Sequence, residues 1–164
     1  MTQDPIERAL ADLGLTLPTP LVPNATYVAS TEFGGLLHVA GQLAYDAEGS
    51  LPFRGRLGVE VDLETGKQCA RRCALHLLAQ IKGGLGSLSR VHRILKLQVY
   101  VACAPDFTDQ HLVANGASDL LCSVLGAAGA HARSAFGVAS LPFGSPVEVD
   151  AVVAFAAGRD QKDG

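Results

Sequence analysis

The chain has 164 residues, of which 48% are hydrophobic, and a formal net charge of -3. This length predicts one compact domain with a sizeable core, since domains commonly hold roughly 100 to 150 residues. The acidic balance excludes a general binder of nucleic acid or anionic membranes, which would need a concentrated basic face. The densest basic run, at 90–96, is short and is interpreted as the solvated start of a strand.

The first residues lack the basic region and apolar run of a signal peptide, and no apolar stretch is predicted to span a bilayer. We therefore expect a cytoplasmic protein. The cysteines fit no paired metal spacing, and a reducing compartment would keep them as thiols. We expect no metal site. Cys69 and Cys73 lie one helical turn apart and are predicted to be small core residues.

The N-terminal part, 1–22, is predicted to form a short helix and a proline-rich arm. Asp4 can cap the helix, Pro5 suits its first position, and apolar residues follow at helical spacing. Three prolines within 17–23 then favour an extended run over the surface, because proline lacks a backbone donor.

A hairpin and a long loop are predicted next. Strand patterns at 27–31 and 36–40 flank Gly34-Gly35, and paired glycines allow the positive backbone angles of a hairpin turn. From 45 to 61 the chain is rich in Gly, Asp, Arg and Pro, so it is predicted to be a surface loop. Loops of this size often border functional sites.

Two helices separated by a strand follow. A capping box at 65–68 predicts a helix that ends at Gly83-Gly84. The alternation over 94–103 predicts a strand whose buried face holds Leu95, Leu97, Val99, Val101 and Cys103. The next helix is predicted over about 108–125. Its core face would consist of Val113, Ala117, Leu120, Leu121 and Val124.

The last predicted elements are two strands that begin near Arg133 and Val147, joined by a turn at Phe143-Gly144. A hairpin needs neither Arg133 nor Glu148. A guanidinium at a strand end presents planar donors that match a carboxylate. A glutamate nearby could orient a water molecule against the same ligand. The pattern therefore indicates chemistry on a small anion.

The predicted hairpin keeps these two residues apart within one chain. With the turn at 143–144, Glu148 would pair near Ala139 or Ser140, about six residues or roughly 20 Å along the strand from Arg133. A small pocket cannot span that gap. We therefore expect Arg133 of one subunit to face Glu148 of a neighbour.

The element order predicts an α+β fold in which a single mixed sheet carries two helices packed on one face. Each helix has one apolar stripe and each strand has one apolar side, which favours this layering. Leu36, Val152 and Ala154 fall on the other side of their strands. That face could be covered by other subunits, so we expect an oligomer.

Several motifs carry a resemblance to a known family. The specific ones are Arg133-Ser-Ala, Leu141-Pro142 and Val147-Glu148-Val-Asp150. Supporting matches are Leu37-His-Val-Ala-Gly41-Gln42, the helix at Gln68, and Leu97-Gln-Val-Tyr-Val-Ala followed by Asp106-Phe107. On these residues the chain resembles the RidA/YjgF family, also labelled L-PSP endoribonuclease. The family-like domain is predicted at 23–157, and 158–164 is a predicted disordered tail.

The resemblance implies a fold like that of the trimeric chorismate mutases, with sheets from three chains around a central barrel and ligand sites between subunits. The implied activity is hydrolysis of reactive 2-enamine and 2-imine acids, such as 2-aminoacrylate, to 2-keto acids and ammonia. No cofactor is expected. The expected partners are a small carboxylate-bearing metabolite and further copies of the chain in a homotrimer, and neither a membrane nor nucleic acid.

The resemblance also implies site residues. As the catalytic pair, Arg133 would hold the substrate carboxylate and Glu148 would position the attacking water. Tyr27 matches a tyrosine that lines the pocket, and Gly41 matches a backbone position close to the ligand.

Two further substrate-binding positions depart from the family pattern. His111 stands where many active deaminases have Asn, and Ala135 stands where they have Cys, Thr or Ser, which indicates altered contacts with the substrate. The N-terminal arm, the 45–61 loop and the segment 113–119 resemble a less characterised branch of the family.

Each candidate also has a structural interpretation, and the sequence leaves both open. Arg133 could be a surface residue at the start of a strand, Glu148 an edge charge that blocks sheet pairing, and Tyr27 ordinary packing. Asn115, Ser118 and Asp119 could be helix surface or could rim the pocket. Two other functions are kept as alternatives: non-catalytic binding of small carboxylates, and an endoribonuclease, against which the acidic balance counts.

Overall fold

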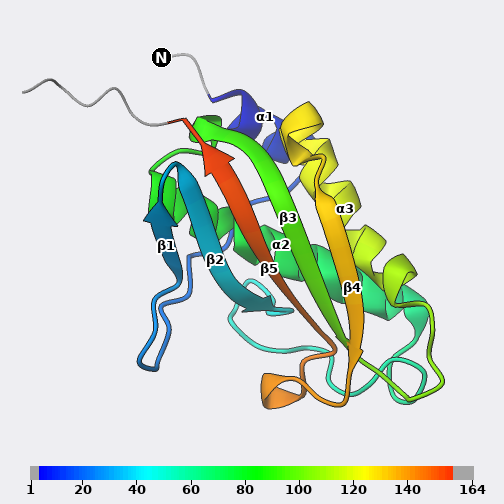
Figure 1. Ribbon diagram of the computed structural model, residues 1–164. Helices are drawn as coiled ribbons and strands as arrows, with labels where there is room; N and C mark the ends of the chain where they lie inside the picture. The colour runs from blue at the N-terminus through cyan, green and yellow to red at the C-terminus, as the bar shows by residue number, and fades with distance from the viewer. Residues whose placement is uncertain (1–3, 157–164) are drawn as a thin grey trace, which may run out of the picture.

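The computed structural model describes residues 4–156, which form one five-stranded sheet with the two long helices on one face (Figure 1). The helices are α1 (Pro5–Asp12), α2 (Leu63–Leu85) and α3 (Gln110–Leu125). The strands are β1 (Ser30–Phe33), β2 (Leu36–Leu43), β3 (Val91–Ala102), β4 (Ala132–Val138) and β5 (Val147–Phe155). Short 3-10 helices occupy Leu88–Arg90, Gly126–Gly129 and Pro142–Gly144. The tail predicted at 158–164 lies outside the described residues.

The sheet has the strand order β1-β2-β5-β3-β4. Strands β3 and β4 are parallel and the other neighbours are antiparallel, so the sheet is mixed. Helices α2 and α3 lie side by side behind it (Figure 1). The predicted α+β fold with two helices on one face of a single mixed sheet is confirmed, and the trimer around a barrel stays a prediction.

The predicted hairpin between β4 and β5 is wrong. Strand β3 lies between them: Arg133 pairs with Leu97 of β3, and Glu148 pairs with Tyr100 of β3. Helix α3 supplies the crossover that a parallel β3–β4 pair requires. The apolar β5 is central in the sheet, whereas the half-exposed β4 forms its edge. The apolar β5 is therefore buried between β2 and β3, and it does not pair with β4 although β4 precedes it in the sequence.

The first hairpin is confirmed. Phe33 pairs with Leu36 across a two-residue turn, and Gly34 and Gly35 have φ of 60° and 78°. These positive angles suit the tight turn that matches the twist of the two strands. Strand β1 starts at Ser30, so Tyr27 precedes it rather than lying within it.

Helix α2 extends beyond both predicted ends. Its N-cap is Asp62, whose carboxylate accepts a hydrogen bond of 2.8 Å from the Thr65 amide. The helix continues through Gly83 and Gly84 and ends at Gly86, which has a φ of 81°. A Cβ at Gly84 would approach Leu37 to 3.4 Å, so this glycine allows close packing on the sheet instead of stopping the helix.

Strand β3 contains an irregularity that changes its buried face. Its register with β5 shifts between Ile94 and Lys96. As a result Ile94 and Leu97 are both fully buried, while Leu95 is 38% exposed, contrary to the prediction that Leu95 faces the core. A bulge adds one residue and so breaks strict alternation.

The segment 45–61 also departs from a purely surface loop. Leu57 is fully buried and Leu51 and Val61 nearly so, and they join the main core. Leu57 bridges Cys103 next to the end of β3. The loop is therefore fixed against the sheet.

Helix α3 and the residues that follow it form a long apolar segment. The segment Gln110–Gly129 passes a test of length and hydropathy for a membrane-spanning helix. In the structure its predicted core face is buried, and a Cβ at Gly116 would overlap the backbone of Lys67, so α3 lies very close to α2. The buried residues of α3 are the five predicted ones, Val113, Ala117, Leu120, Leu121 and Val124, together with Ala114 and Leu125. Its apolar character is therefore explained by packing in the core.

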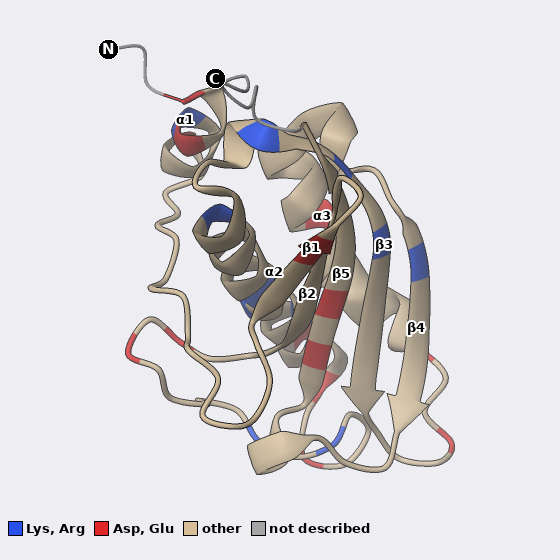
Figure 2. Ribbon diagram, turned by 60° about the vertical axis from the view of Figure 1, so that its left-hand side comes forward, with Lys and Arg blue, Asp and Glu red and all other residues tan. Residues whose placement is uncertain are grey.

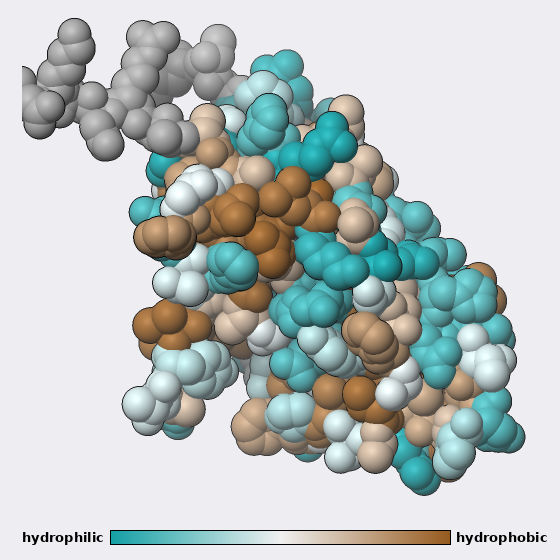
Figure 3. Space-filling model, in the orientation of Figure 1, coloured by the Kyte–Doolittle hydropathy of each residue, from teal (hydrophilic) through white to brown (hydrophobic). Residues whose placement is uncertain are grey.

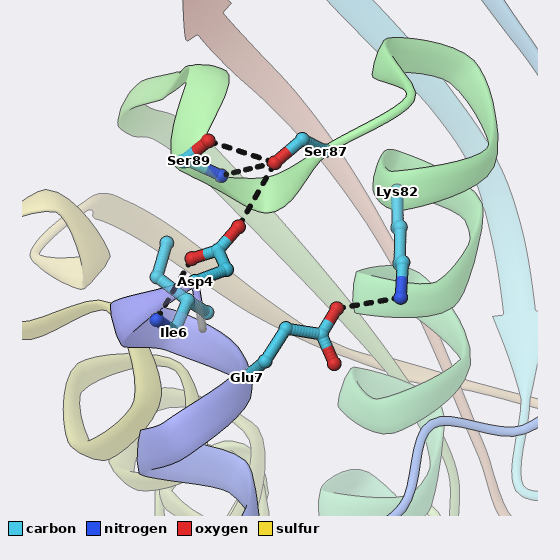
Figure 4. A network of polar contacts seen from close by, with 6 residues as sticks. All are labelled: Asp4, Ile6, Glu7, Lys82, Ser87 and Ser89. Carbon is cyan, nitrogen blue, oxygen red and sulfur yellow. Dashed lines mark hydrogen bonds and ion pairs between the residues drawn. The ribbon is translucent and has the colours of Figure 1, made fainter. Parts of the chain in front are cut away.

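The N-terminal helix is tied to the rest of the fold by polar contacts (Figure 4). The Ser87 hydroxyl donates to Asp4 at 2.9 Å, and Lys82 forms an ion pair with Glu7 at 2.5 Å. Leu10 is 2% exposed and belongs to the core. The segment before the proline-rich run is therefore part of the packed structure.

The sheet face away from the helices is partly apolar. Hydrophobic side chains gather over the upper end of the sheet (Figure 3), where Leu36 pairs with Ala154 and His38 with Val152. Further along, β5 carries two acidic residues (Figure 2), and the neighbouring β3 carries Arg93 and Lys96. We call this the open face. Its apolar part agrees with the predicted oligomer, which remains a prediction.

Candidate functional site

Three of the six predicted site residues lie around one cavity. Tyr27, Gly41 and Glu148 line a hollow of about 410 Å³, together with Tyr45 and Phe143. The proline-rich arm closes one side of it through Leu21, Val22 and Pro23. The predicted long loop contributes Tyr45, as expected of a loop that borders a site. We call this hollow the Glu148 pocket.

Glu148 lies on the open face of β5, half-buried. Burial raises the pKa of its carboxyl group above the ordinary value of 4.5, and the negative charge of Asp150 raises it further. Both effects disfavour the ionised form. A carboxylate whose pKa is raised toward neutrality is a stronger base, which suits a group that takes a proton from water.

Gly41 gives Glu148 the space it occupies. Strand β2 shifts register between Val39 and Gln42, and Gly41 lies within this irregularity. A Cβ added there would lie 2.8 Å from Cδ of Glu148 and would overlap its Oε1 atom. Gly41 does not have a positive φ, so the space that it leaves for Glu148 is the reason for a glycine at this position.

We predict that Gly41→Ala displaces the Glu148 side chain and lowers kcat/KM for the reaction proposed below by up to about 100-fold, since a misplacement of about 1 Å can cost that much. Overpacking should also lower the free energy of unfolding by about 1–3 kcal/mol. Steady-state kinetics and thermal melts measure the two effects. Gly83→Ala is the matched control, because its Cβ would make only an ordinary 3.5 Å contact with Pro20. Equal kinetics in Gly41→Ala and wild type would contradict the prediction.

Arg133 is held at the edge of the sheet by helix α3. Its Nη1 donates to Oδ1 of Asn115 at 2.9 Å and to Oγ of Ser118 at 3.0 Å, and its Nη2 donates to the carbonyl oxygen of His111 at 3.1 Å. Arg133 is half-buried and borders a hollow of about 360 Å³, which Ser118 and His131 also line. We call Arg133, the α3 residues that hold it and this hollow the Arg133 edge.

The fixed guanidinium keeps donors in reserve. Arginine has five N–H donors, of which three are used by α3, so Nε–H and one Nη2–H have no acceptor within residues 4–156. Two donors on a planar group match the two oxygens of a carboxylate. The arrangement can therefore bind a small organic acid.

The other two predicted residues lie near Arg133. His111 is exposed, and its contact with Arg133 is through the backbone carbonyl, not the imidazole. Ala135 lies on β4, pairs with Val99 of β3 and packs against the core. Their predicted contacts with substrate stay predictions.

The two groups of residues do not meet within one chain. Glu148 belongs to the open face, whereas Arg133 pairs with the buried Leu97 and reaches α3 on the helix side. The earlier expectation that one chain lacks a shared pocket agrees with this arrangement, but the reason differs. The residues are separated by the two faces of the sheet, not by distance along a hairpin.

The sequence left open whether Asn115 and Ser118 are helix surface or rim the pocket. Asn115 and Ser118 contact it directly, so they are more than helix surface. With His111 they follow an i, i+4, i+7 spacing that places them on one helical stripe. This polar stripe on an otherwise apolar helix was the available signal.

A second polar network on the open face was also missed. Gln98 and Tyr100 of β3 donate to the Asp150 carboxylate, each at 3.0 Å. Burial, and then the hydrogen bond and charge of Asp150, raise the pKa of Tyr100 to about 12. The network places a fixed negative charge beside Glu148.

Metal binding finds no support in the described part of the chain. Within residues 4–156 no three His, Cys, Asp or Glu side chains are grouped so that they could hold a metal ion.

Relatives of the chain are similar over most of its length. Protein TCP17 of Trypanosoma cruzi is 48% identical over 145 residues, which are 88% of this chain and 90% of that protein. The crystal structure of Atu1372, a protein of unknown function from Agrobacterium tumefaciens, has 46% identity and a TM-score of 0.86. It covers 93% of this chain and 95% of its own.

The fold is also that of a protein in the predicted family. The YjgF gene product of E. coli has 20% identity and a TM-score of 0.60, over 85% of this chain and 94% of its own. The family model described as "Endoribonuclease L-PSP" matches residues 18–155. The match includes the Glu148 pocket and the Arg133 edge. The chain therefore belongs to the endoribonuclease L-PSP family, the family of the RidA and YjgF proteins.

Proposed function

We propose that this protein hydrolyses reactive 2-enamine and 2-imine acids to 2-keto acids and ammonia, in sites formed between subunits of a homotrimer. Arg133 of one subunit would hold the substrate carboxylate, and Glu148 of the next would activate water. The observation that carries the proposal is the Arg133 guanidinium, which α3 fixes while two N–H donors stay available.

The reaction needs little beyond positioning, because an imine carbon is already electrophilic. Glu148 takes a proton from water while the oxygen adds to the imine carbon, and it passes this proton to the nitrogen, which gives a carbinolamine. Glu148 then takes the hydroxyl proton of the carbinolamine and gives it to the nitrogen, so that the C–N bond breaks, the C=O bond forms and ammonia leaves. One water is consumed, and one keto acid and one ammonia are formed.

The electrostatics of the Glu148 pocket support this role. Burial and the charge of Asp150 raise the pKa of Glu148, which makes its carboxylate a stronger base than an ordinary one. The aromatic residues Tyr27, Tyr45 and Phe143 border the same hollow and would limit access of bulk water once a neighbour covers it.

The proposal is tested by release of ammonia and keto acid from freshly generated 2-aminoacrylate. Wild-type protein should accelerate the release over buffer. Binding of pyruvate that depends on Arg133, without any acceleration for a panel of 2-imine acids, would instead support a non-catalytic binder of carboxylates. Cleavage of RNA that is lost in Arg133→Ala would favour the endoribonuclease alternative.

The shared site makes a separate prediction. Arg133→Ala and Glu148→Gln are each expected to be inactive, but a trimer assembled from both can contain an interface with an intact Arg133 and an intact Glu148. If chains mix randomly, about one quarter of the interfaces are intact, so activity should recover to about one quarter of wild type. This value holds for the unfractionated mixture. Co-expression with two affinity tags isolates the mixed trimers, in which one site of three is intact, so their activity should be about one third of wild type. Absence of recovery in verified mixed oligomers would show that each site uses one chain.

A further inference from the structure

His131 lies between α3 and β4 and contacts the group that fixes Arg133. Its Nδ1 is hydrogen-bonded to the carbonyl oxygen of Gly129, and its Nε2 lies 2.9 Å from Oγ of Ser118. The same Ser118 oxygen accepts from Nη1 of Arg133 at 3.0 Å. Four groups are therefore linked in series: Gly129, His131, Ser118 and Arg133.

The chemistry of these atoms assigns the protons. A carbonyl oxygen only accepts, so Nδ1 of His131 carries the hydrogen that it shares with Gly129. In the neutral ring Nε2 is then an acceptor, and the Ser118 hydroxyl donates to it. This leaves the lone pairs of the Ser118 oxygen facing Arg133. The neutral imidazole thus orients the hydroxyl that receives the guanidinium.

Protonation of His131 would disturb this order. Nε2 would become a donor, so the Ser118 oxygen would face donors from both His131 and Arg133, and two cations would lie close together. Burial lowers the pKa of His131, and the charge of Arg133 lowers it further, which keeps the ring neutral at neutral pH. The titratable groups that line the hollow with His131 are Arg133 and Cys122, and no carboxylate of residues 4–156 lines it.

We propose that His131, acting through Ser118, is a positioning residue that holds Arg133 in the orientation required to bind the carboxylate of the substrate. This inference rests on the proposed role of Arg133 as the carboxylate-binding group. Asn115 supports the guanidinium through a separate bond at 2.9 Å, which gives an independent point of comparison.

Two substitutions of His131 separate its two hydrogen bonds. In His131→Asn, the amide can still donate to Gly129 but is too short to reach Ser118. In His131→Gln, the longer side chain can accept from Ser118 but cannot titrate. At pH 8, we expect His131→Asn to weaken binding of pyruvate, measured by calorimetry, by between about twofold and tenfold, the effect of one lost hydrogen bond. His131→Gln should stay within about twofold of wild type.

Combinations of substitutions test whether the effect passes through Ser118. The double variant His131→Asn/Ser118→Ala should bind pyruvate no more weakly than Ser118→Ala alone, because both changes break one series of bonds. His131→Asn/Asn115→Ala should instead show the product of the two single effects. An additive effect of His131→Asn on top of Ser118→Ala would overturn the proposal, as would unchanged affinity in His131→Asn.

A measurement on His131 itself is independent of any ligand. Nitrogen-15 NMR should show the Nδ1–H tautomer above the pKa of His131, and Ser118→Ala should raise that pKa, because the hydroxyl stabilises the neutral ring. An Nε2–H tautomer, or a pKa that does not respond to Ser118→Ala, would overturn the relay even if pyruvate binds. If wild type fails to bind pyruvate while NMR shows the expected tautomer and pKa response, the proposed function fails and the hydrogen-bond relay is retained.

Discussion

Replacing Arg133 with alanine is expected to reduce kcat/KM for hydrolysis of 2-aminoacrylate on the order of 10²- to 10³-fold. Loss of one partner of a desolvated, hydrogen-bonded charge pair typically costs about 2–5 kcal/mol. Arg133→Lys should recover only part of the loss, because lysine keeps the charge but lacks the planar pair of donors. Release of ammonia and keto acid under steady-state conditions measures both variants.

A matched control for Arg133→Ala is Arg8→Ala. Arg8 is an exposed arginine on α1, outside the Glu148 pocket and the Arg133 edge. The Arg8→Ala substitution should leave kcat/KM within about twofold of wild type, because it removes only a surface charge. Because Arg133 also contacts the backbone of α3, its loss could destabilise the fold. Thermal melts of Arg133→Ala test whether unfolding causes the loss of activity. Activity of Arg133→Ala equal to that of Arg8→Ala would contradict carboxylate binding by Arg133.

The sequence pattern predicted the elements of the fold better than their pairing. The pattern predicted five of the seven buried residues of α3, because an apolar stripe with period 3.6 reports directly which side is buried; it missed Ala114 and Leu125. The pairing of β4 and β5 was wrong, since a turn between two strand patterns does not say whether a third strand enters between them. The insertion of β3 depends on contacts far apart in sequence.

The candidate site was predictable only in part, and for a related reason. Residue types and the family resemblance pointed to Arg133 and Glu148, and the structure places them on different faces of the sheet. The support from Asn115, Ser118 and His131 could not be read from a single strand pattern, because it joins α3, the segment after it and β4. The periodicity of α3 showed only that Ser118 lies off the core face.

The need for Gly41 illustrates a further limit of local patterns. The sequence pattern ended the strand at 40, and only the family resemblance marked Gly41 as a position close to the ligand. In the structure Gly41 lies within β2, where a glycine often signals a bulge or a close approach. The group that approaches, the carboxylate of Glu148, lies more than one hundred residues away along the chain and becomes a neighbour only because β2 pairs with β5. The space for the proposed base is thus a property of the sheet register.

Replacing Glu148 with glutamine is expected to lower kcat by about 10²- to 10⁴-fold, the usual contribution of a general base, while leaving pyruvate binding nearly unchanged. The same change should stabilise the fold. Because burial and Asp150 raise the pKa of Glu148 above 4.5, the native state binds this proton more tightly than the unfolded state does. The free energy of unfolding therefore falls as the pH rises from 4.5 through the native pKa of Glu148. Above the native pKa, the full cost of burying the ionised carboxylate is present.

A neutral glutamine removes this cost. The melting temperature of Glu148→Gln should exceed that of wild type by about 1–3 °C at pH 7, and the difference should vanish near pH 4, where both side chains are uncharged. Scanning calorimetry at the two pH values measures the effect. Asp46→Asn is the matched control on the loop at the rim, because its carboxylate accepts from the amides of Glu48 and Ser50 and so should lose stability at pH 7. A lower melting temperature for Glu148→Gln at pH 7 would mean that the ionised carboxylate is favoured in the fold, which is incompatible with a proton acceptor whose basicity is raised by burial.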